Sequence, residues 1–138
     1  MLSHVFLFSG ASAVGKTAVL RHLLPLLDTA ENACCLCKID CLTSNDGDVF
    51  DGLGIPNVTG LSGDICPDHF LVSNLPELWS WAQTQGCSTL VIETAGLCHR
   101  CSPATAAMVA GCVLDATSSC RAPAQLGPML TEADFVVL

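Results

Sequence analysis

The sequence predicts an α/β fold of three layers, in which helices cover both faces of a mostly parallel central sheet. A strand expected at residues 5–8 and a helix expected at 18–24 are joined by the complete phosphate-binding motif G-x-x-x-x-G-K-T at residues 10–17. Hydrophobic residues make up 51% of the 138 residues. No apolar run approaches the ~18 residues of a membrane span, so this apolar content belongs to a buried sheet.

Each fixed residue of the phosphate-binding loop has a chemical reason. Gly10 and Gly15 lack a Cβ atom, so the backbone can curl around a phosphate chain and point its N–H groups at the anion. The Lys16 ammonium then reaches the β and γ phosphates, and the Thr17 hydroxyl ligates a bridging Mg²⁺ ion. The nucleotide-binding residues expected in this loop are Gly10, Ser12, Ala13, Val14, Gly15, Lys16, Thr17 and Ala18.

A turn and a second strand are expected after the first helix. Pro25 is expected to kink or end that helix, because proline lacks the backbone N–H that a helix interior needs, and the polar residues 28–32 follow as a turn. Residues 33–40 form an apolar run that ends in Asp40. Ligands of open α/β sheets bind outside the carboxyl ends of strands, so Asp40 either holds the metal ion or the attacking water, or is an ordinary turn aspartate.

The least regular pattern lies at residues 42–73, where we expect a long loop in the place of a nucleotide-sensing switch. Asn74 is expected to cap the following helix and Gly86 to stop it. The remaining expected elements are a helix at 75–82, strands at 89–93, 112–115 and 134–138, and a helical or turn-rich segment at 123–132.

A carboxylate closes the strand expected at residues 89–93, and a glycine follows three positions later. We expect Glu93 to order the magnesium ion and the attacking water, and Gly96 to offer a backbone N–H to the γ phosphate. Lys16, Asp40 and Glu93 therefore form the expected catalytic set.

The composition limits the partners and the compartment. Five basic residues against thirteen acidic ones give a net charge of −8, which argues against nucleic acid or an anionic membrane as a partner. Ten cysteines in a nucleotide-binding chain indicate a cytoplasmic protein whose cysteines remain thiols or metal ligands. We expect a single domain over residues 1–138.

Two short motifs have the spacing of metal ligands. Cys66 and His69 form a C-x-x-H pair, Cys98 and Cys101 form a C-x-x-C pair, and together they can supply a Cys₃His set. Alternatively, cysteines of two protomers meet at a dimer axis and hold one ion or an iron–sulfur cluster, or Cys98 and Cys101 are unliganded thiols. Thiolates suit Zn²⁺, copper or iron–sulfur, and imidazole with thiolate also accepts Ni²⁺. The cysteines expected to be small core residues are Cys34, Cys35, Cys37 and Cys41.

These features together resemble the nickel metallochaperone GTPases HypB and UreG, of the CobW/HypB/UreG group in the SIMIBI class of P-loop NTPases. The resemblance spans nearly the whole chain and is carried by residues 10–17, Asp40, residues 63–69, the Glu93-Thr94-Ala95-Gly96 segment and residues 127–138. It implies a P-loop NTPase that dimerises across its nucleotide and couples hydrolysis to metal delivery into a client metalloenzyme. The family's cysteine–histidine metal site is matched by Cys66 and His69, with two residues between them.

The resemblance also implies a guanine-recognition motif beyond Leu138, so the chain is expected to be incomplete at its C-terminal end and the choice between GTP and ATP stays open. We expect a nucleotide hydrolase that acts as a metallochaperone, with Mg²⁺ and either Zn²⁺, Ni²⁺ or an iron–sulfur cluster. One alternative is an ATP-dependent iron–sulfur protein for electron transfer or reductive activation. The others are a small-molecule kinase and a nucleotide-binding module without turnover.

Overall fold

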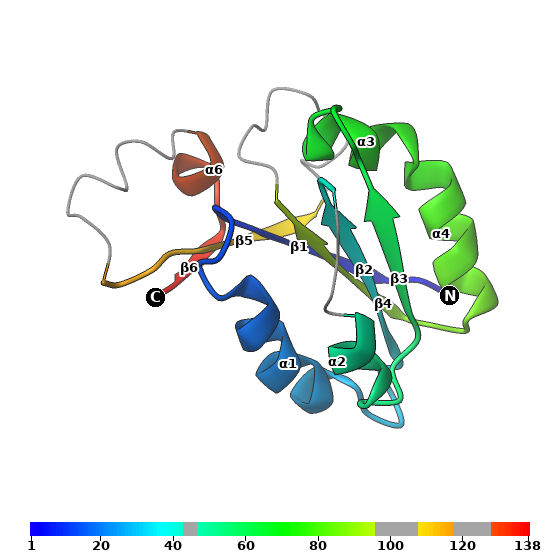
Figure 1. Cartoon of the computed structure of the whole chain (residues 1–138). Helices are drawn as coiled ribbons and strands as arrows, with labels where there is room; N and C mark the ends of the chain where they lie inside the picture. The colour runs from blue at the N-terminus through cyan, green and yellow to red at the C-terminus, as the bar shows by residue number, and fades with distance from the viewer. Residues whose placement is uncertain (43–46, 96–107, 118–127) are drawn as a thin grey trace.

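The computed structural model describes residues 1–42, 47–95, 108–117 and 128–138, in which strands and helices alternate along the chain (Figure 1). The strands are β1 (His4–Ser9), β2 (Cys34–Asp40), β3 (Asn57–Leu61), β4 (Thr89–Thr94), β5 (Val109–Val113) and β6 (Phe135–Val137). The helices are α1 (Lys16–Leu27), α2 (Gly47–Asp51), α3 (Pro67–Ser73), α4 (Leu75–Thr84) and α6 (Pro128–Thr131). No helix in these ranges is both long and apolar enough to span a bilayer.

The six described strands form one sheet in the order β3-β2-β4-β1-β5-β6, and every neighbouring pair is parallel. β1, which leads into the phosphate-binding loop, lies between β4 and β5. In this register Glu93 of β4 lies opposite both Phe8 of β1 and Lys38 of β2. The carboxyl ends of these three strands therefore meet at one edge of the sheet, and the predicted α/β fold with a parallel central sheet is confirmed.

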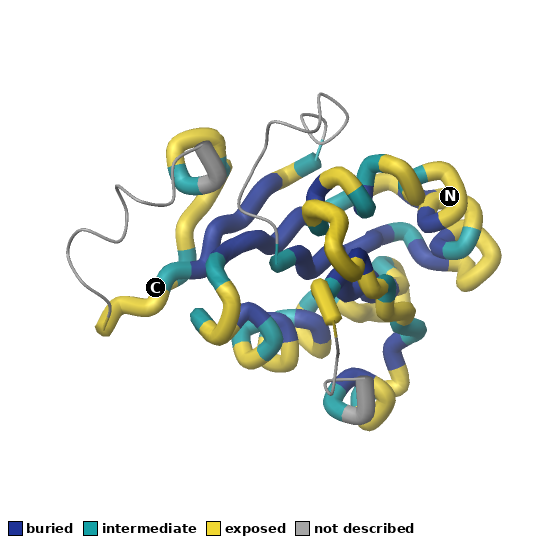
Figure 2. Tube along the Cα trace, turned by 45° about the horizontal axis from the view of Figure 1, so that its top comes forward, coloured by how far each residue is buried: buried dark blue, intermediate teal, exposed yellow. Residues whose placement is uncertain are grey.

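Helices cover both faces of the sheet, which gives the three predicted layers (Figure 1, Figure 2). Successive residues of a strand point to opposite faces, and both faces are buried here, so the inner strands are nearly continuous apolar runs. The cluster on the α3 and α4 face includes Cys35, Cys37, Ile39, Leu71, Leu78 and Ile92. The cluster on the α1 and α2 face includes Phe8, Leu20, Leu24, Leu36, Phe50 and Val91.

The structure corrects three expectations about element boundaries. The described part of residues 42–73 is not one irregular loop but contains α2, β3 and α3, which are short and separated by glycine- and proline-containing turns. The strand expected at 112–115 is β5, which begins at Val109 with small residues that carry little apolar signal. α1 continues past Pro25 to Leu27, so the proline does not end the helix, and a kink at Pro25 stays a prediction.

Asn74 joins α3 to α4 in a manner that differs from the expected cap. Its side chain makes no cap hydrogen bond to α4, and its Nδ2 atom instead donates to the carbonyl oxygen of Phe70 at 2.7 Å. Asn74 thus satisfies an acceptor at the end of the preceding helix α3. Gly86, with φ +74°, follows the end of α4 in the left-handed conformation that commonly stops a helix.

Cysteines fill much of the interior at β2. Cys34, Cys35 and Cys37 are buried, as expected, whereas Cys41 just beyond the strand is exposed and is not a core residue. Burial raises the pKa of the Cys34 thiol to about 11 and that of the Cys37 thiol to about 12, because removal from water disfavours the thiolate. The native fold therefore keeps these thiols protonated and unreactive.

Native thiol labelling tests this burial. We expect iodoacetamide at about pH 8 to modify Cys34 and Cys37 more than about a hundredfold more slowly than Cys41 and Cys66, since alkylation needs the thiolate. A labelling time course followed by peptide mass spectrometry measures the four rates, and in guanidinium chloride the rates should become similar. A native Cys37 that reacts as fast as Cys41 would contradict the buried position of β2.

Candidate functional site

The phosphate-binding loop runs from the end of β1 to the first turn of α1 and depends on its two glycines. Gly10 has φ +146°, and a Cβ atom placed there would lie 2.5 Å from the carbonyl oxygen of Val113 in β5. Gly15 has φ +98° and immediately precedes α1. Ser12 and Ala13 are exposed, and α1 has no acidic residue in its first turn. The N-terminus of α1 therefore favours an anion, through its N–H groups and the helix dipole.

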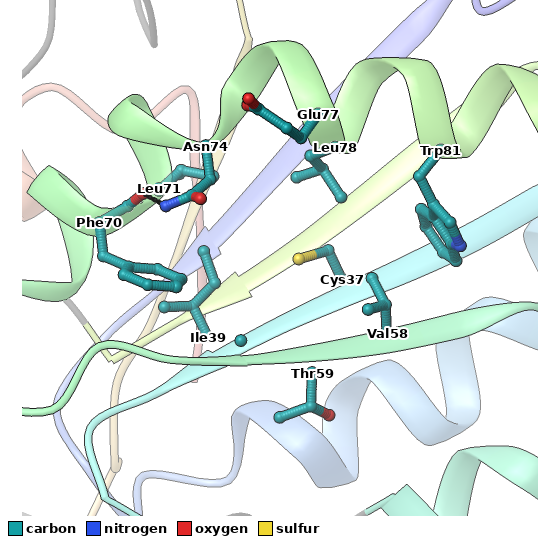
Figure 3. A pocket seen from close by; sticks show the side chains of 11 residues that line it. Cys37, Ile39, Val58, Thr59, Phe70, Leu71, Asn74, Glu77, Leu78 and Trp81 are labelled. Atoms are coloured by element: carbon teal, nitrogen blue, oxygen red, sulfur yellow. Dashed lines mark hydrogen bonds between the residues drawn. The ribbon is translucent and has the colours of Figure 1, made fainter.

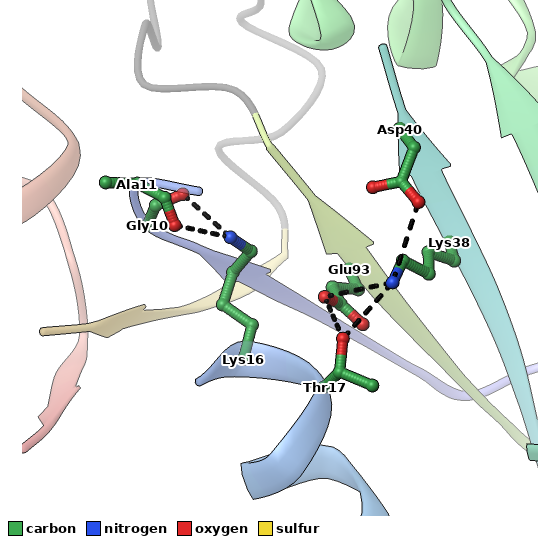
Figure 4. Close-up of polar contacts among 7 residues, drawn as sticks. All are labelled: Gly10, Ala11, Lys16, Thr17, Lys38, Asp40 and Glu93. Carbon is green, nitrogen blue, oxygen red and sulfur yellow. Dashed lines mark hydrogen bonds and ion pairs between the residues drawn. The ribbon is translucent and has the colours of Figure 1, made fainter. Parts of the chain in front are cut away.

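Lys16 begins α1, and its side chain turns back over the loop. Its Nζ atom donates to the carbonyl oxygens of Gly10 at 3.0 Å and Ala11 at 2.8 Å (Figure 4). Burial of this side chain lowers the pKa of the ammonium, while the carboxylates of Glu93 and Asp40 oppose that lowering. The loop carbonyls thus hold a buried positive charge next to the N–H groups of the loop.

Three oxygen-bearing side chains from α1, β2 and β4 lie together beside the loop, and we call Thr17, Asp40 and Glu93 the oxygen cluster (Figure 4). The Thr17 hydroxyl donates to Glu93 Oε1 at 2.9 Å. Glu93 is 4% exposed, whereas the Asp40 side chain at the end of β2 is 22% exposed. The structure brings together the residues to which the sequence assigns Mg²⁺ and the attacking water, and that role stays a prediction.

Lys38 lies within the oxygen cluster, although it was not among the residues selected from the sequence. Its Nζ atom donates to Thr17 Oγ1 at 3.2 Å and lies 3.5 Å from Asp40 Oδ2 and 3.9 Å from Glu93 Oε1 (Figure 4). The residue is 5% exposed. A signal was present in the sequence, because Lys38 is the only basic residue of an apolar strand and stands two positions before Asp40, on the same face of β2.

The two oxygens of the Glu93 carboxylate have different surroundings. Oε1 accepts the Thr17 hydrogen bond, whereas Oε2 is buried and has no hydrogen-bond partner among the described residues. Burial raises the pKa of Glu93, and the Lys38 ammonium and the Thr17 hydroxyl act in the opposite direction. Glu93 therefore has one oxygen engaged by the protein and one able to accept a further contact.

The residues expected to hold a second metal are divided between the described and undescribed parts of the chain. Cys66 immediately precedes α3 and His69 lies in its first turn, and both are exposed. Cys98, Cys101 and the expected phosphate sensor Gly96 lie outside the described residues. Within the described ranges, no three His, Cys, Asp or Glu side chains gather as metal ligands. The metal-binding role of Cys66 and His69 stays a prediction.

Asp68 connects this start of α3 to the end of β4. It lies between Cys66 and His69 in the sequence, is 5% exposed, and accepts a 3.5 Å hydrogen bond from Thr94 Oγ1. Thr94 directly follows Glu93, so α3 contacts the strand that carries one member of the oxygen cluster. Asp68 was not predicted from the sequence, because a single aspartate in an irregular segment carries no recognisable pattern.

An apolar pocket of about 270 Å³ lies between β2, β3 and the helices α3 and α4 (Figure 3). Its lining includes Ile39, Val58, Phe70, Leu78 and Trp81. Ile39 alternates with Lys38 and Asp40 along β2, so this pocket is on the opposite face of the sheet from the oxygen cluster. The candidate functional site is therefore the loop with its adjacent cluster, and the pocket is a separate feature.

The chain is similar to another protein in sequence and to solved structures in fold. No protein-family model matches the chain. An uncharacterized protein of Methanocaldococcus jannaschii, MJ0120, is 46% identical over 134 residues, which cover 97% of this chain. The chain spans 57% of the length of that relative.

Solved structures with the same architecture are more distant in sequence. HypB from Helicobacter pylori in complex with nickel superposes with a TM-score of 0.57 at 17% identity, over 81% of this chain and 52% of that chain. The signal recognition particle receptor FtsY from Elizabethkingia anophelis in complex with GDP gives a TM-score of 0.59 at 19% identity, over 82% of this chain and 40% of that chain. These similarities confirm the P-loop NTPase fold.

Proposed function

We propose that the chain binds a nucleoside triphosphate with Mg²⁺ at the phosphate-binding loop and hydrolyses the terminal phosphate. One observation carries the proposal: Lys16 and the oxygen cluster lie together at the carboxyl edge of the parallel sheet, beside the N-terminus of α1. The groups come from three separate elements, so only the fold assembles them. This arrangement is what phosphoryl transfer requires, since its catalysis rests on positioning and charge.

The oxygen cluster fits Mg²⁺ by its chemistry. The ion prefers hard oxygen ligands, and the cluster offers the Thr17 hydroxyl and the carboxylates of Asp40 and Glu93. The buried Oε2 atom of Glu93, which no described donor contacts, can accept a hydrogen bond from a water of the ion. When bound, Mg²⁺ would offset the negative charge that develops on the phosphate oxygens.

The remaining roles belong to the chain's own groups. Backbone N–H groups of residues 10–18 bind the phosphate oxygens, because the loop and the first turn of α1 direct them toward an anion. Lys16 contributes a positive charge that is already desolvated and held by two loop carbonyls. Asp40 and Glu93 orient the attacking water, and Gly96 offers a further N–H to the γ phosphate.

We expect a guanine nucleotide to be preferred over ATP. The HypB and UreG proteins that the sequence resembles are GTPases, and the similar FtsY structure contains GDP. The binding experiment therefore titrates GTP and ATP separately, and GTP is expected to bind more tightly.

We further propose that nucleotide state controls a cysteine-lined metal site and that the chain is a cytoplasmic, dimeric maturation factor for a metalloenzyme. The sequence resemblance to HypB and UreG supports this, as does the structural similarity to HypB in complex with nickel. Cys66 and His69 are exposed at the start of α3, where an ion can reach them. The contact between Asp68 and Thr94 gives a physical link from this helix to the strand that carries Glu93.

Isothermal titration calorimetry tests the nucleotide part. With Mg²⁺ present, we expect GTP to bind in the micromolar range typical of enzyme substrates, and EDTA to weaken this binding by about tenfold or more. Thr17→Val keeps the side-chain shape without the hydroxyl and should lose most of the Mg²⁺ enhancement. If neither GTP nor ATP binds in the presence of Mg²⁺, the proposed function is wrong.

Metal analysis and an ultraviolet–visible spectrum after anaerobic purification test the metal part. We expect zinc or nickel at about one ion per chain or per dimer, with loss of the ion in Cys66→Ser and in Cys98→Ala/Cys101→Ala. Iron with sulfide would favour the electron-transfer alternative instead. A chain without any metal would remove the metallochaperone part and leave the nucleotide hydrolase.

A further inference from the structure

The ammonium of Lys38 contacts every member of the oxygen cluster. It donates to Thr17 Oγ1 at 3.2 Å and forms ion pairs with Asp40 at 3.5 Å and Glu93 at 3.9 Å (Figure 4). These are the three groups that a Mg²⁺ ion bound by the cluster would use. Lys16 does not share the position, because its Nζ atom is hydrogen-bonded to the carbonyl oxygens of the loop.

A metal ion and the Lys38 ammonium compete for the oxygens of Thr17, Asp40 and Glu93. Mg²⁺ holds its ligand oxygens at about 2.0–2.1 Å, so an ion on Thr17 Oγ1 enters the immediate surroundings of an ammonium that donates to the same atom. Two positive groups at such a distance repel each other, and the repulsion is stronger in a buried site than in water. Lysine has a flexible four-carbon stem, so its ammonium can move away when the ion arrives.

We infer that Lys38 is an internal cation, which holds the oxygen cluster together before a metal arrives and competes with Mg²⁺ for it. The inference rests on the proposed function, because it takes the cluster as the magnesium site. Lys38 acts as a positioning residue: it compensates the buried Glu93 carboxylate and keeps Asp40 near Thr17. It also keeps the affinity for free Mg²⁺ low, so the ion enters together with the negative phosphates of the nucleotide.

Electron paramagnetic resonance of Mn²⁺, a hard-oxygen substitute for Mg²⁺, tests this inference without nucleotide. The loss of the free Mn²⁺ signal on titration into the full chain gives the affinity of the cluster for the ion. We expect Lys38→Gln to bind Mn²⁺ at least about tenfold more tightly than the original chain, because it removes a unit charge next to a dication. Adding Asp40→Asn to Lys38→Gln should reverse the gain, which places the ion at the cluster.

Two matched variants separate charge from other effects. Lys38→Arg keeps a positive charge in β2 and should bind Mn²⁺ as weakly as the original chain. Arg21→Gln removes an equal charge from an exposed position of α1 and should also leave the affinity unchanged within about twofold, since exposed charges are well screened. An unchanged Mn²⁺ affinity in Lys38→Gln would overturn the inference and leave Lys38 as a structural ion pair.

A thermal melt provides a second measurement. Without Lys38 the buried Glu93 carboxylate has lost its ion pair, so Lys38→Gln should melt well below the original chain in EDTA, and Mg²⁺ should restore much of this difference in melting temperature.

If Lys38→Gln does not fold in either condition, the Mn²⁺ titration compares Glu93→Gln with Glu93→Gln/Lys38→Gln instead. The double variant should then bind Mn²⁺ about tenfold more tightly than Glu93→Gln. Equal affinities would again overturn the inference.

These measurements stay distinct from the test of the proposed function, because no nucleotide is present in them. A chain that fails to bind GTP and ATP would contradict the proposed function, whatever Lys38→Gln does to Mn²⁺ binding. A chain that binds both nucleotides with Mg²⁺ but shows no gain of Mn²⁺ affinity in Lys38→Gln would contradict only the role of Lys38.

Discussion

Replacing Lys16 with glutamine is expected to lower the rate of nucleotide hydrolysis by at least about a hundredfold, the loss typical when one charge-stabilising donor is removed from an active site. Glutamine keeps an N–H donor on a side chain one atom shorter than that of lysine, whose Nζ atom donates to the carbonyl oxygens of Gly10 and Ala11. What is lost is the buried positive charge beside the phosphates. Phosphate release at saturating nucleotide and Mg²⁺ measures the effect, and calorimetry measures the accompanying loss of triphosphate affinity.

Two controls show whether this loss is specific to the site. Arg21→Gln removes the same charge from an exposed position of the same helix and should hydrolyse nucleotide within about twofold of the original chain. The melting temperature of Lys16→Gln should not fall by more than a few degrees, because burial of the Lys16 ammonium is itself unfavourable. If Lys16→Gln hydrolyses nucleotide at the rate of the original chain, Lys16 does not contact the phosphates.

Replacing Gly10 with alanine is expected to destabilise the fold strongly, although the substitution adds a single methyl group. The new Cβ atom would lie 2.5 Å from the backbone carbonyl oxygen of Val113, and φ +146° is unfavourable for alanine. Because neither β1 nor β5 can move without disturbing the sheet, we expect the free energy of unfolding to fall by about 3 kcal/mol or more. Urea denaturation followed by circular dichroism measures the change.

Gly54→Ala is the matched control for this substitution. Gly54 also has a positive φ, of +70°, but a Cβ atom there would meet no atom of the described residues within 4 Å, its chain neighbours aside. Only the backbone penalty remains, so we expect a loss of about 1–2 kcal/mol. Equal losses at the two positions would contradict the close approach of the loop to β5, and with it the placement of the phosphate-binding loop against the sheet.

Much of the candidate site could be predicted because its signals are local or follow from a single topological rule. The phosphate-binding residues are contiguous, so their motif is visible in the sequence. Asp40 and Glu93 each stand at the end of an apolar run, and a parallel sheet brings such ends to one edge. These two facts sufficed to select Thr17, Asp40 and Glu93, whereas Lys38, which lies among them in the described part of the chain, was not selected. The chemical roles of Thr17, Asp40 and Glu93 stay predictions.

The rest depends on contacts between distant segments, which a local pattern such as the single basic residue of β2 does not identify. Lys38 belongs to the site because it lies opposite Glu93, and this pairing follows from the adjacency of β2 and β4. Asp68 is linked to the site by its contact with Thr94, and this contact requires α3 to pack near the end of β4. The edge strand β3 was missed because it is only partly buried, so it lacks the continuous apolar run of the inner strands.

The position of β1 between β4 and β5 has a consequence for how this protein is made. During translation β1 and the phosphate-binding loop are synthesised before the strands that flank β1, which are Thr89–Thr94 and Val109–Val113. At roughly 5–20 residues per second, the ribosome takes several seconds or more to supply them. The nascent chain therefore exposes an apolar strand without its neighbours for that time, which makes β1 a natural target for chaperones that bind nascent chains.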